Sequence, residues 1–516
     1  MSSTEPVLDA ERSSHDDSKS PKDISYPSDA IHSEQSTAAR GLRVPEIIAR
    51  LTPEQRNELE KRLVRKIDWR LLPMIVIMYI LNYIDRNNIA AAKLAGLPEA
   101  LNLKGNEYQT SVSILFVGYL LFQVPSNLLL NKIGLPAVYL PTCMMLWGTI
   151  SALTSTVTNF SGLIAVRFFL GFVEAAYFPG CLFYLSCWYT RKELGLRTAL
   201  LYSGALISGA FSGLIAAGVD ANLTGVRGYG AWQWLFIIEG VITVGVAFMA
   251  LFILPNFPRT TKWLSEEEKA LAVWRLEEDI GQDDWVDEDQ KSLWYGAKLA
   301  FADSKTYVLL FLLIGIVSSG GVTNFLPTVV KTLGYNDVDT LLLTSPPYIL
   351  AVIVAAFNGW HADKTGERFW HITCSLVVAL VGFIIAAATT SIGPRYFAII
   401  IMVPGVYGGF VVSLAWISNT MPRPPAKRAA ALAFINAVSN ATSIYVSYLY
   451  QDFQGPRYIA AFATNSATIV LAIASALTLR IMLTRLNKKL DKGEYVEGAI
   501  NAVPGEAAEH GFRFKV

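Results

Sequence analysis

Apolar runs of about twenty residues recur along the chain from Leu71 onward, separated by short polar turns. A helix of this length crosses a hydrocarbon core of about 30 Å. The pattern therefore predicts an all-α membrane protein with twelve transmembrane helices. The expected spans are 71–92, 109–130, 137–157, 161–185, 198–218, 232–254, 305–330, 341–361, 371–391, 395–416, 429–450 and 458–483.

Residues 52–70, just before the first run, mix charged side chains with apolar ones at helical spacing. They open with a Thr-x-x-Gln pattern, which is typical of a capped helix start. We expect an amphipathic helix lying on the membrane face. Its apolar positions are Leu59, Leu63 and Ile67.

The composition supports lipid as the solvent, because only 16% of the residues are charged and mean hydropathy is +0.38. The net charge of +1 argues against a nucleic-acid partner. All four cysteines lie in apolar runs, so we expect no disulfide framework. No His/Cys cluster has metal-ligand spacing and no glycine-rich phosphate loop is present. We therefore expect no cofactor, no ATP-driven pump and no enzyme.

Lysine and arginine lie mainly in the even-numbered turns and just outside the first and last spans, which predicts that both ends of the chain are cytosolic. We expect five regions: a disordered tail at 1–50, a six-helix bundle at 51–254, a linker at 255–304, a second bundle at 305–485 and a tail at 486–516.

The two predicted bundles carry a shared pattern, since NLLLNKIGL at 127–135 aligns with GWHADKTGE at 359–367, an offset of 232 residues. Two equivalent halves of this size are typical of a rocking-bundle transporter, which holds its substrate near the midplane between them.

Five ionisable residues lie inside the predicted spans of the first half, and their equivalents in the second half are uncharged. A charge at this depth costs about 2.5–3.5 kcal/mol on insertion scales, so each needs a partner or a task. Arg167 and Glu174 are seven apart and share one helix face, whereas neighbouring residues such as Asp85 and Arg86 point apart. The five are Asp85, Arg86, Arg167, Glu174 and Glu239.

An arginine fork suits a substrate carboxylate, because it offers two parallel charge-assisted hydrogen bonds. A carboxylate buried beside that arginine can change its protonation when the substrate arrives, which couples an organic anion to a proton. The alternative is a set of static ion pairs, such as Asp85 with Arg167, that brace the bundle. For Glu239, a structural or gating pair and a coupling role both stay open.

The loop GWHADKTGER at 359–368 resembles the Gly-x-x-x-Asp-Arg/Lys-x-Gly-Arg loop of the major facilitator superfamily, although Glu367 stands where a basic residue is usual. Its first-half counterpart is degraded, with asparagine for the Gly and for the Asp. The resemblance implies a gating loop made of Gly359, Asp363, Lys364, Gly366 and Arg368.

The patterns NYIDRNN in the first span and RFFLGFVEA in the fourth resemble the anion:cation symporter branch of that superfamily. Longer stretches, including EAAYFPGCLFYLSCWYTRKELGLRTALLYSG, look like the fungal allantoate, nicotinate and pantothenate permeases. The resemblance implies that Arg86 contacts the anion, that Asp85 and Glu174 carry the proton, and that Arg167 pairs with Glu174 or the substrate.

In the second half, Asn324, Trp416 and Asn440 are the candidates for substrate binding, with hydrogen bonds between helices as the alternative role; Glu239 joins Asp85 and Glu174 as a candidate for proton coupling. The sequence thus predicts a monomeric transporter that takes up a small organic carboxylate with protons across the plasma membrane. An exporter of an organic acid or secondary metabolite is the alternative with the same architecture. A transporter-like nutrient sensor is a further alternative, to which the tails give little support.

Overall fold

The computed structural model describes residues 44–283, 293–421, 425–494, 496 and 513–516. Most of the predicted 1–50 tail therefore lies outside the described residues. Regular structure within them is helical throughout. The α-helices of the first half are α2 (Glu46–Ala49), α3 (Pro53–Leu94), α4 (Leu97–Ala100), α5 (Glu107–Ile133), α6 (Pro136–Leu153), α7 (Phe160–Glu174), α8 (Tyr177–Ser186), α9 (Arg191–Leu223) and α10 (Ala231–Ile253).

Two helices, α11 (Glu266–Asp283) and α12 (Leu293–Ala302), lie in the predicted linker. Short 3₁₀ turns join several of the elements; one of them, η5 (Gly321–Phe325), lies inside the seventh predicted span. The α-helices of the second half are α13 (Ser304–Gly320), α14 (Leu326–Lys331), α15 (Asp337–Leu343), α16 (Ser345–Thr365), α17 (Phe369–Ala388), α18 (Ile392–Thr420), α19 (Pro425–Val446) and α20 (Ile459–Asp491).

Eleven helical stretches in the described part of the chain are long and apolar enough to span a membrane. The one remaining predicted span, 109–130, is the second in chain order. It forms α5, a helix of 27 residues that is not among those eleven. Polar residues near its start, among them Gln109 and Ser111, lower its hydropathy. Because α5 packs between α7 and α19, it completes the twelve-helix arrangement.

The predicted separation of 52–70 from the first span is wrong, because α3 is one continuous helix of 42 residues. Its predicted cap is confirmed: Thr52 Oγ1 accepts a hydrogen bond from the backbone amide of Gln55 at 3.3 Å, and the backbone amide of Thr52 donates to Gln55 Oε1 at 3.0 Å. Leu63 and Ile67 are fully buried within the protein. They are therefore not free to enter a membrane face, and α3 packs there against α11.

Three predicted spans are interrupted where the structure bends. The fourth breaks between α7 and α8, directly after Glu174, and the eighth breaks between α15 and α16 beside Pro346 and Pro347. The seventh breaks at Gly320 and Gly321, where η5 separates α13 from α14. Broken helices in a membrane protein are tolerated where the freed backbone lines a cavity or is buried in protein.

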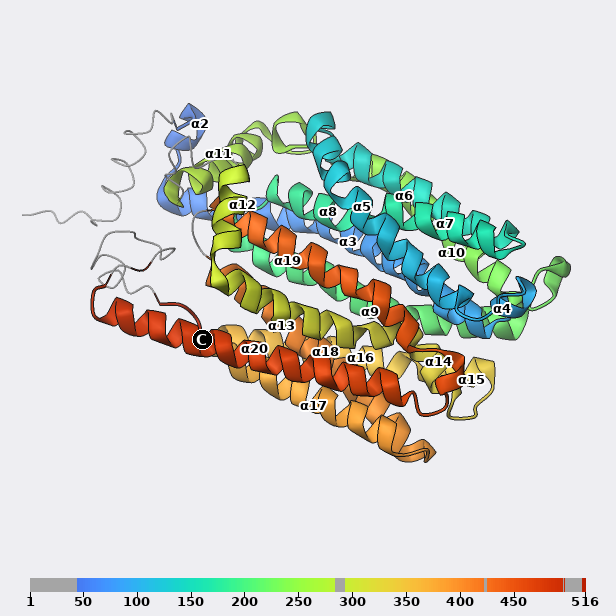
Figure 1. Cartoon of the computed structure of the whole chain (residues 1–516). Helices are drawn as coiled ribbons and strands as arrows, with labels where there is room; N and C mark the ends of the chain where they lie inside the picture. The colour runs from blue at the N-terminus through green and yellow to red at the C-terminus, as the bar shows by residue number, and fades with distance from the viewer. Residues whose placement is uncertain (1–43, 284–292, 422–424, 495, 497–512) are drawn as a thin grey trace, which may run out of the picture. The chain divides into compact units, whose positions relative to one another are not determined.

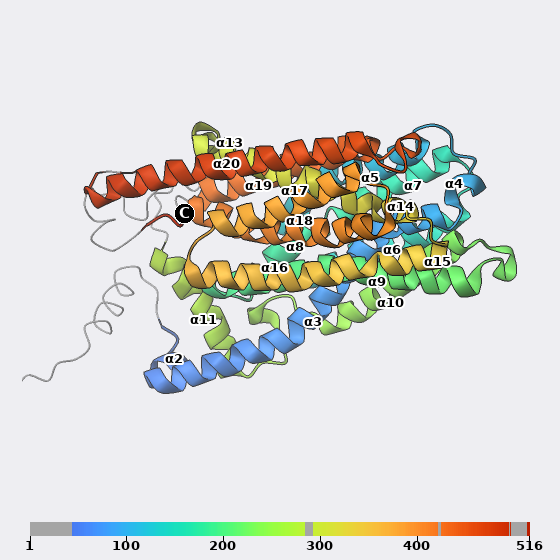
Figure 2. The same ribbon diagram turned by 90° about the horizontal axis from the view of Figure 1, so that it is seen from below.

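The helices form two bundles of six spans each (Figures 1 and 2). The first bundle contains α3 and α5 to α10, and the second contains α13 to α20. They meet where α9 packs on α15 and α16, where α5 packs on α19, and where α3 packs on α14. Residues of α3, α5 and α9 from the first bundle and of α13, η5, α16, α18 and α19 from the second line the space between the bundles.

The two ends of the bundles differ in how they are joined. We call the end with α11 and α12 the linker end, and the end with α4, α14 and α15 the Lys93 end (Figures 1 and 2). At the Lys93 end, Lys93 Nζ contacts Asp452 Oδ1 at 2.5 Å and Gln109 donates to the Tyr450 carbonyl. Ser113 also donates to the carbonyl of Ile444. These contacts hold the bundles together at that end.

Asp303 marks the junction of the linker and the second bundle. It accepts ion pairs from Lys427 at 2.7 Å and from Lys305 at 3.4 Å. Burial favours the neutral acid, but the two ammonium groups prevail and hold the pKa of Asp303 below its usual value. The resulting stabilisation is present at neutral pH and is lost as the pH falls through that lowered pKa.

Glycines allow the closest helix contact in the first bundle. A Cβ at Gly171 on α7 would meet the backbone of Leu115 on α5, and a Cβ at Gly118 would meet the backbone of Phe168. Small residues let membrane helices approach this closely.

Replacing Gly171 by alanine should therefore destabilise the fold, because the added methyl group meets backbone that cannot move aside. We expect a loss of about 1–3 kcal/mol, measured as a lower thermal unfolding temperature in detergent. Gly245→Ala on α10 is the matched control, since a Cβ there meets nothing within 4 Å. Equal unfolding temperatures for the two variants would contradict this packing.

Candidate functional site

The main cavity lies between the two bundles. It encloses about 760 Å³ of atom-free space, part of which is open to solvent. A smaller space of about 230 Å³ adjoins it and shares four lining residues with it: Arg86, Asn87, Phe116 and Asn324.

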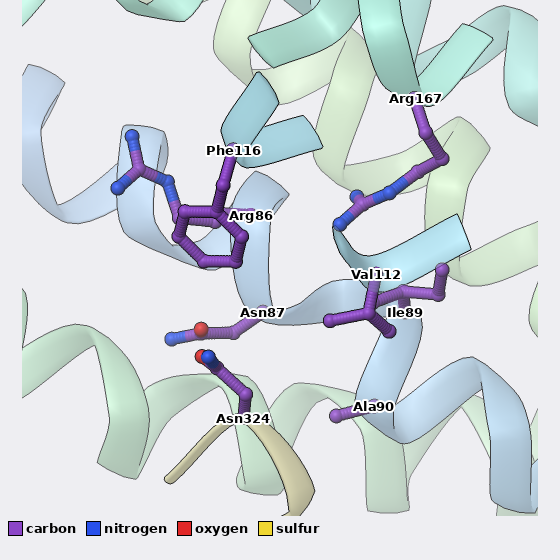
Figure 3. A pocket seen from close by; sticks show the side chains of 8 residues that line it. All are labelled: Arg86, Asn87, Ile89, Ala90, Val112, Phe116, Arg167 and Asn324. Carbon is purple, nitrogen blue, oxygen red and sulfur yellow. The ribbon is translucent and has the colours of Figure 1, made fainter. Parts of the chain in front are cut away.

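Both cavities are cationic on the side of the first bundle. Arg86 of α3 lines both spaces, and Arg167 of α7 lines the smaller one. No acidic side chain lines either cavity in the described part of the chain. Figure 3 shows Arg167 reaching in from α7, while Asn87 and Asn324 point toward one another from the two bundles.

Arg86 is held by one ion pair and two aromatic rings. Its Nε donates to Glu174 Oε2 at 3.1 Å, and its guanidinium carbon lies 5.0 Å from the Tyr83 ring centre and 4.8 Å from that of Tyr119. Apart from a side-chain hydrogen bond with Tyr119, its terminal nitrogens have no partner among the described residues. They are the groups left to receive a ligand.

Glu174 is completely buried at the last residue of α7. One carboxylate oxygen accepts from Arg86, and the other has no hydrogen-bond partner among the described residues. A buried carboxylate left with a single partner depends strongly on that partner for its charge. The state of Glu174 is therefore tied to what Arg86 binds.

Arg167 interacts with Glu174 electrostatically but forms no direct ion pair with a carboxylate among the described residues. Its Nε donates to the Ser111 carbonyl at 3.3 Å, and its buried Nη1 has no partner in the described structure. The expected static pair of Asp85 with Arg167 is thus not formed, and the acid that we expected beside Arg167 is bound to Arg86 instead. The charge of Arg167 remains available beside the smaller cavity.

Asp85 points away from the cavities, as its position next to Arg86 requires. Its two carboxylate oxygens accept hydrogen bonds of 2.8 Å, one from Ser151 of α6 and one from Thr243 of α10. The residue is fully buried and lines neither cavity. Asp85 therefore ties α3 to two neighbouring helices of the first bundle.

Glu239 of α10 belongs to the same polar cluster behind α3. It lies in electrostatic contact with Asp85 and Asn88. Both oxygens of Glu239 and both polar atoms of the Asn88 amide are buried without a hydrogen-bond partner among the described residues. The structure thus brings two of the predicted coupling residues, Asp85 and Glu239, together, and Asp85 also lies within electrostatic range of Glu174.

Of the three predicted substrate-binding residues in the second half, two line a cavity and one does not. Asn324 lines both spaces and Asn440 lines the main one, where its amide donates to the Asn436 carbonyl at 2.8 Å. Trp416 lines neither cavity, because its indole nitrogen donates to the Lys515 carbonyl at 2.9 Å. The expectation that Trp416 contacts substrate is therefore not supported by its position.

The predicted gating loop lies at the linker end. Gly359, Asp363 and Lys364 occupy the last turns of α16, and Gly366 caps that helix with φ of 72°. The left-handed conformation at that cap is one that glycine adopts without strain. Arg368 precedes α17 and pairs with Asp363 at 2.5 Å.

Several lining residues were not predicted from the sequence. They are Tyr83, Asn87, Phe116, Tyr202, Thr323, Tyr348, Tyr407 and Phe410. Aromatic residues are common in membrane helices, so only Asn87, which directly follows Arg86, carried a local signal. The others reach the cavity through the packing of α3, α5, α9, η5, α16 and α18.

Two six-span bundles around a central cationic cavity define a polytopic membrane transporter rather than an enzyme. Residues 75–447 match the Major Facilitator Superfamily. The chain belongs to this superfamily.

Known fungal transporters are similar along most of the chain. The MFS-type transporter cnsO of Penicillium expansum is 35% identical over 473 residues, which cover 88% of this chain and 90% of that protein. The MFS-type transporter efuF of Hormonema carpetanum is 35% identical over 410 residues, covering 78% and 81%. The major facilitator-type transporter hxnP of Emericella nidulans is 31% identical over 444 residues, covering 84% and 88%.

A solved structure supports the fold independently. A bacterial homologue of the human lysosomal transporter Spinster, in an inward-facing and unoccupied conformation, aligns with a TM-score of 0.61. The match covers 80% of this chain and 95% of that one at 14% sequence identity. At this identity the likeness shows the shared fold alone.

The polar cluster behind α3 generates a stability prediction. Thr243→Val keeps the side-chain shape but leaves one buried oxygen of Asp85 without a donor, which should cost about 1–3 kcal/mol. Thermal unfolding in detergent measures the loss. Thr149→Val is the matched control, because Thr149 is exposed and bonds only to its own helix. The assignment fails if both variants unfold at the wild-type temperature.

Proposed function

We propose that the chain takes up a small organic carboxylate together with protons. The observation that carries the proposal is the charge of the central cavity, which two arginines and no acid line in the described residues. A desolvated cationic site of this kind favours an anion. The fungal allantoate, nicotinate and pantothenate permeases, which the sequence resembles, suggest the class of acid.

In the proposed complex, Arg86 receives the substrate carboxylate through its two terminal nitrogens. Its Nε stays directed at Glu174, and the rings of Tyr83 and Tyr119 limit where the guanidinium can turn. Asn87 and Asn324 supply neutral donors and acceptors on opposite sides. The aromatic lining of the main cavity suits the apolar or planar body of such an acid.

Proton coupling follows from the single partner of Glu174. If a substrate carboxylate shares the charge of Arg86, an ionised Glu174 loses part of the compensation that its one ion-pair partner among the described residues provides, and the more distant charge of Arg167 is left to offset the rest. Taking up a proton removes that unfavourable charge, so the anion and the proton favour each other's binding. We propose Glu174 as the proton carrier; Asp85 and Glu239 stay predictions, because neither lines a cavity.

The direction and location of transport are also part of the proposal. We place the linker end in the cytosol and the protein in the plasma membrane, on the excess of Lys and Arg near the linker end. In this orientation the contacts at the Lys93 end close the outer side. The transporter functions as a monomer in this proposal.

Arg86→Lys should lose most uptake although the positive charge remains. An ammonium cannot hold Glu174 and also present two fixed donors to a carboxylate, so we expect a loss of about 2 kcal/mol or roughly thirtyfold in uptake. Uptake of radiolabelled nicotinate and related acids into cells expressing each variant measures the effect.

Arg259→Lys is the matched control, because Arg259 is exposed in the linker and lines no cavity. It should transport like the wild type at equal surface expression. Unchanged uptake by Arg86→Lys would remove Arg86 from the substrate site.

Glu174→Gln should uncouple transport from pH. Wild-type uptake should be faster at pH 5 than at pH 7 and should collapse with an uncoupler, whereas the variant should exchange substrate down its gradient equally at both values. Glu239→Gln should keep the pH response, because Glu239 does not contact Arg86. If Glu239→Gln loses the response and Glu174→Gln keeps it, the proton carrier has been assigned to the wrong residue.

Transport into membrane vesicles of known orientation decides between uptake and export. Inside-out vesicles with an acidic interior should accumulate the acid if the protein exchanges it for protons. Accumulation only in right-side-out vesicles with acidic medium supports symport.

A further inference from the structure

The described residues 513–516 return to the second bundle at the linker end. Arg513 pairs with Asp491, 22 residues earlier at the end of α20, through contacts of 2.7 and 2.8 Å. The segment Arg513–Val516 then crosses from α20 to α18 and α17. Residues far apart in the sequence thus meet in one groove, which is separate from the central cavity.

The groove binds the backbone of the segment at every step. The Asn487 amide of α20 both donates to the Phe514 carbonyl and accepts from the Phe514 amide, each at 2.9 Å. Trp416 of α18 donates to the Lys515 carbonyl at 2.9 Å, and the Arg368 amide donates to the Val516 carbonyl at 2.9 Å. The backbone carbonyls of Phe514, Lys515 and Val516 therefore accept hydrogen bonds from α20, α18 and the start of α17, respectively.

A side-chain anchor accompanies these backbone contacts. Phe514 is 2% exposed, and Lys305 at the start of α13 places its ammonium 5.4 Å from the ring centre. Burial of an aromatic ring beside a cation is a favourable, geometrically specific contact. Phe514 thus fixes the register of the segment in the groove.

The surrounding side chains recognise the backbone of the segment. Trp416 is completely buried, so its indole N–H has to find an acceptor inside the protein, and the Lys515 carbonyl is that acceptor. An amide that pairs with both backbone groups of one residue, as Asn487 does, recognises backbone rather than a particular side chain. The ring of Phe514 adds the selectivity.

We propose that Arg513–Val516 is a ligand built into the chain, which docks in the groove formed by Lys305, Arg368, Trp416 and Asn487. The docked segment connects the start of α13, the end of the predicted gating loop, α18 and α20. It thereby fixes the position of that loop relative to the rest of the second bundle. The inference is independent of which substrate the protein carries.

Hydrogen–deuterium exchange on the full chain in detergent tests this docking. In the wild type, the Phe514 amide, which donates to Asn487, should exchange at least about tenfold more slowly than in a free peptide of the same sequence. Asn487→Ala should remove this protection. It should also speed exchange at the Arg368 amide, which Asn487 does not touch but the docked segment does.

Thr484→Ala is the matched control, because Thr484 is exposed on the same helix and makes no contact with the segment. It should leave both exchange rates unchanged. Phe514→Ala changes only the ligand and should reproduce the effect of Asn487→Ala without altering α20. Wild-type exchange at the free-peptide rate, or full protection in both Asn487→Ala and Phe514→Ala, would overturn the proposal.

Discussion

The structure depends on how it compensates charge inside an apolar bundle. Arg86 and Glu174 neutralise each other across α3 and α7, and Tyr83 and Tyr119 shield the guanidinium. An unpaired ion in this position would cost several kcal/mol. The pair is therefore stable only while both members keep each other as partners, and any anion that approaches Arg86 competes with Glu174. The same contact that allows the bundle to fold makes it responsive to a ligand.

Helix α3 separates two polar regions with different tasks. Arg86 and Asn87 face the cavity, while Asp85 faces Ser151 and Thr243 in the interior of the first bundle. The cluster around Asp85 joins α3, α6 and α10 through hydrogen bonds to an acid that contacts no base among the described residues. It thereby holds α3 in a fixed rotation, and that rotation aims Arg86 at the space between the bundles. Asp85 thus positions α3, and its neighbour Arg86 faces the cavity.

The membrane-spanning helices could be predicted from the sequence, because hydrophobic periodicity determines them. The lengths of the apolar runs predicted the spans. The free-energy cost of burying a charge identified Arg86, Arg167 and Glu174 as candidates for the site. The sequence could not predict partners, since spacing shows that Arg167 and Glu174 share a face but not that Arg86 reaches Glu174 first. It was wrong for the 52–70 helix, whose apolar face the linker covers. The position of Trp416 was also missed, because its partner lies 99 residues away in sequence.

The two bundles make unequal contributions, and this inequality fits a transporter that must change shape. The first bundle supplies the charges of the site, whereas the second supplies neutral groups such as Asn324 and the break at Gly320 and Gly321. At the Lys93 end, Asp220 of the first bundle lies in electrostatic range of Lys331 and Asp337 of the second, and Lys93 forms an ion pair with Asp452, whose side chain is 69% exposed. Such a pair contributes about 0–1 kcal/mol, and the neighbouring hydrogen bonds to carbonyls can be exchanged for water. Parting the bundles at this end also exposes the apolar cluster in which Leu341 of the second bundle packs with Leu97 and Leu163 of the first, whereas the costly charges stay together inside one half.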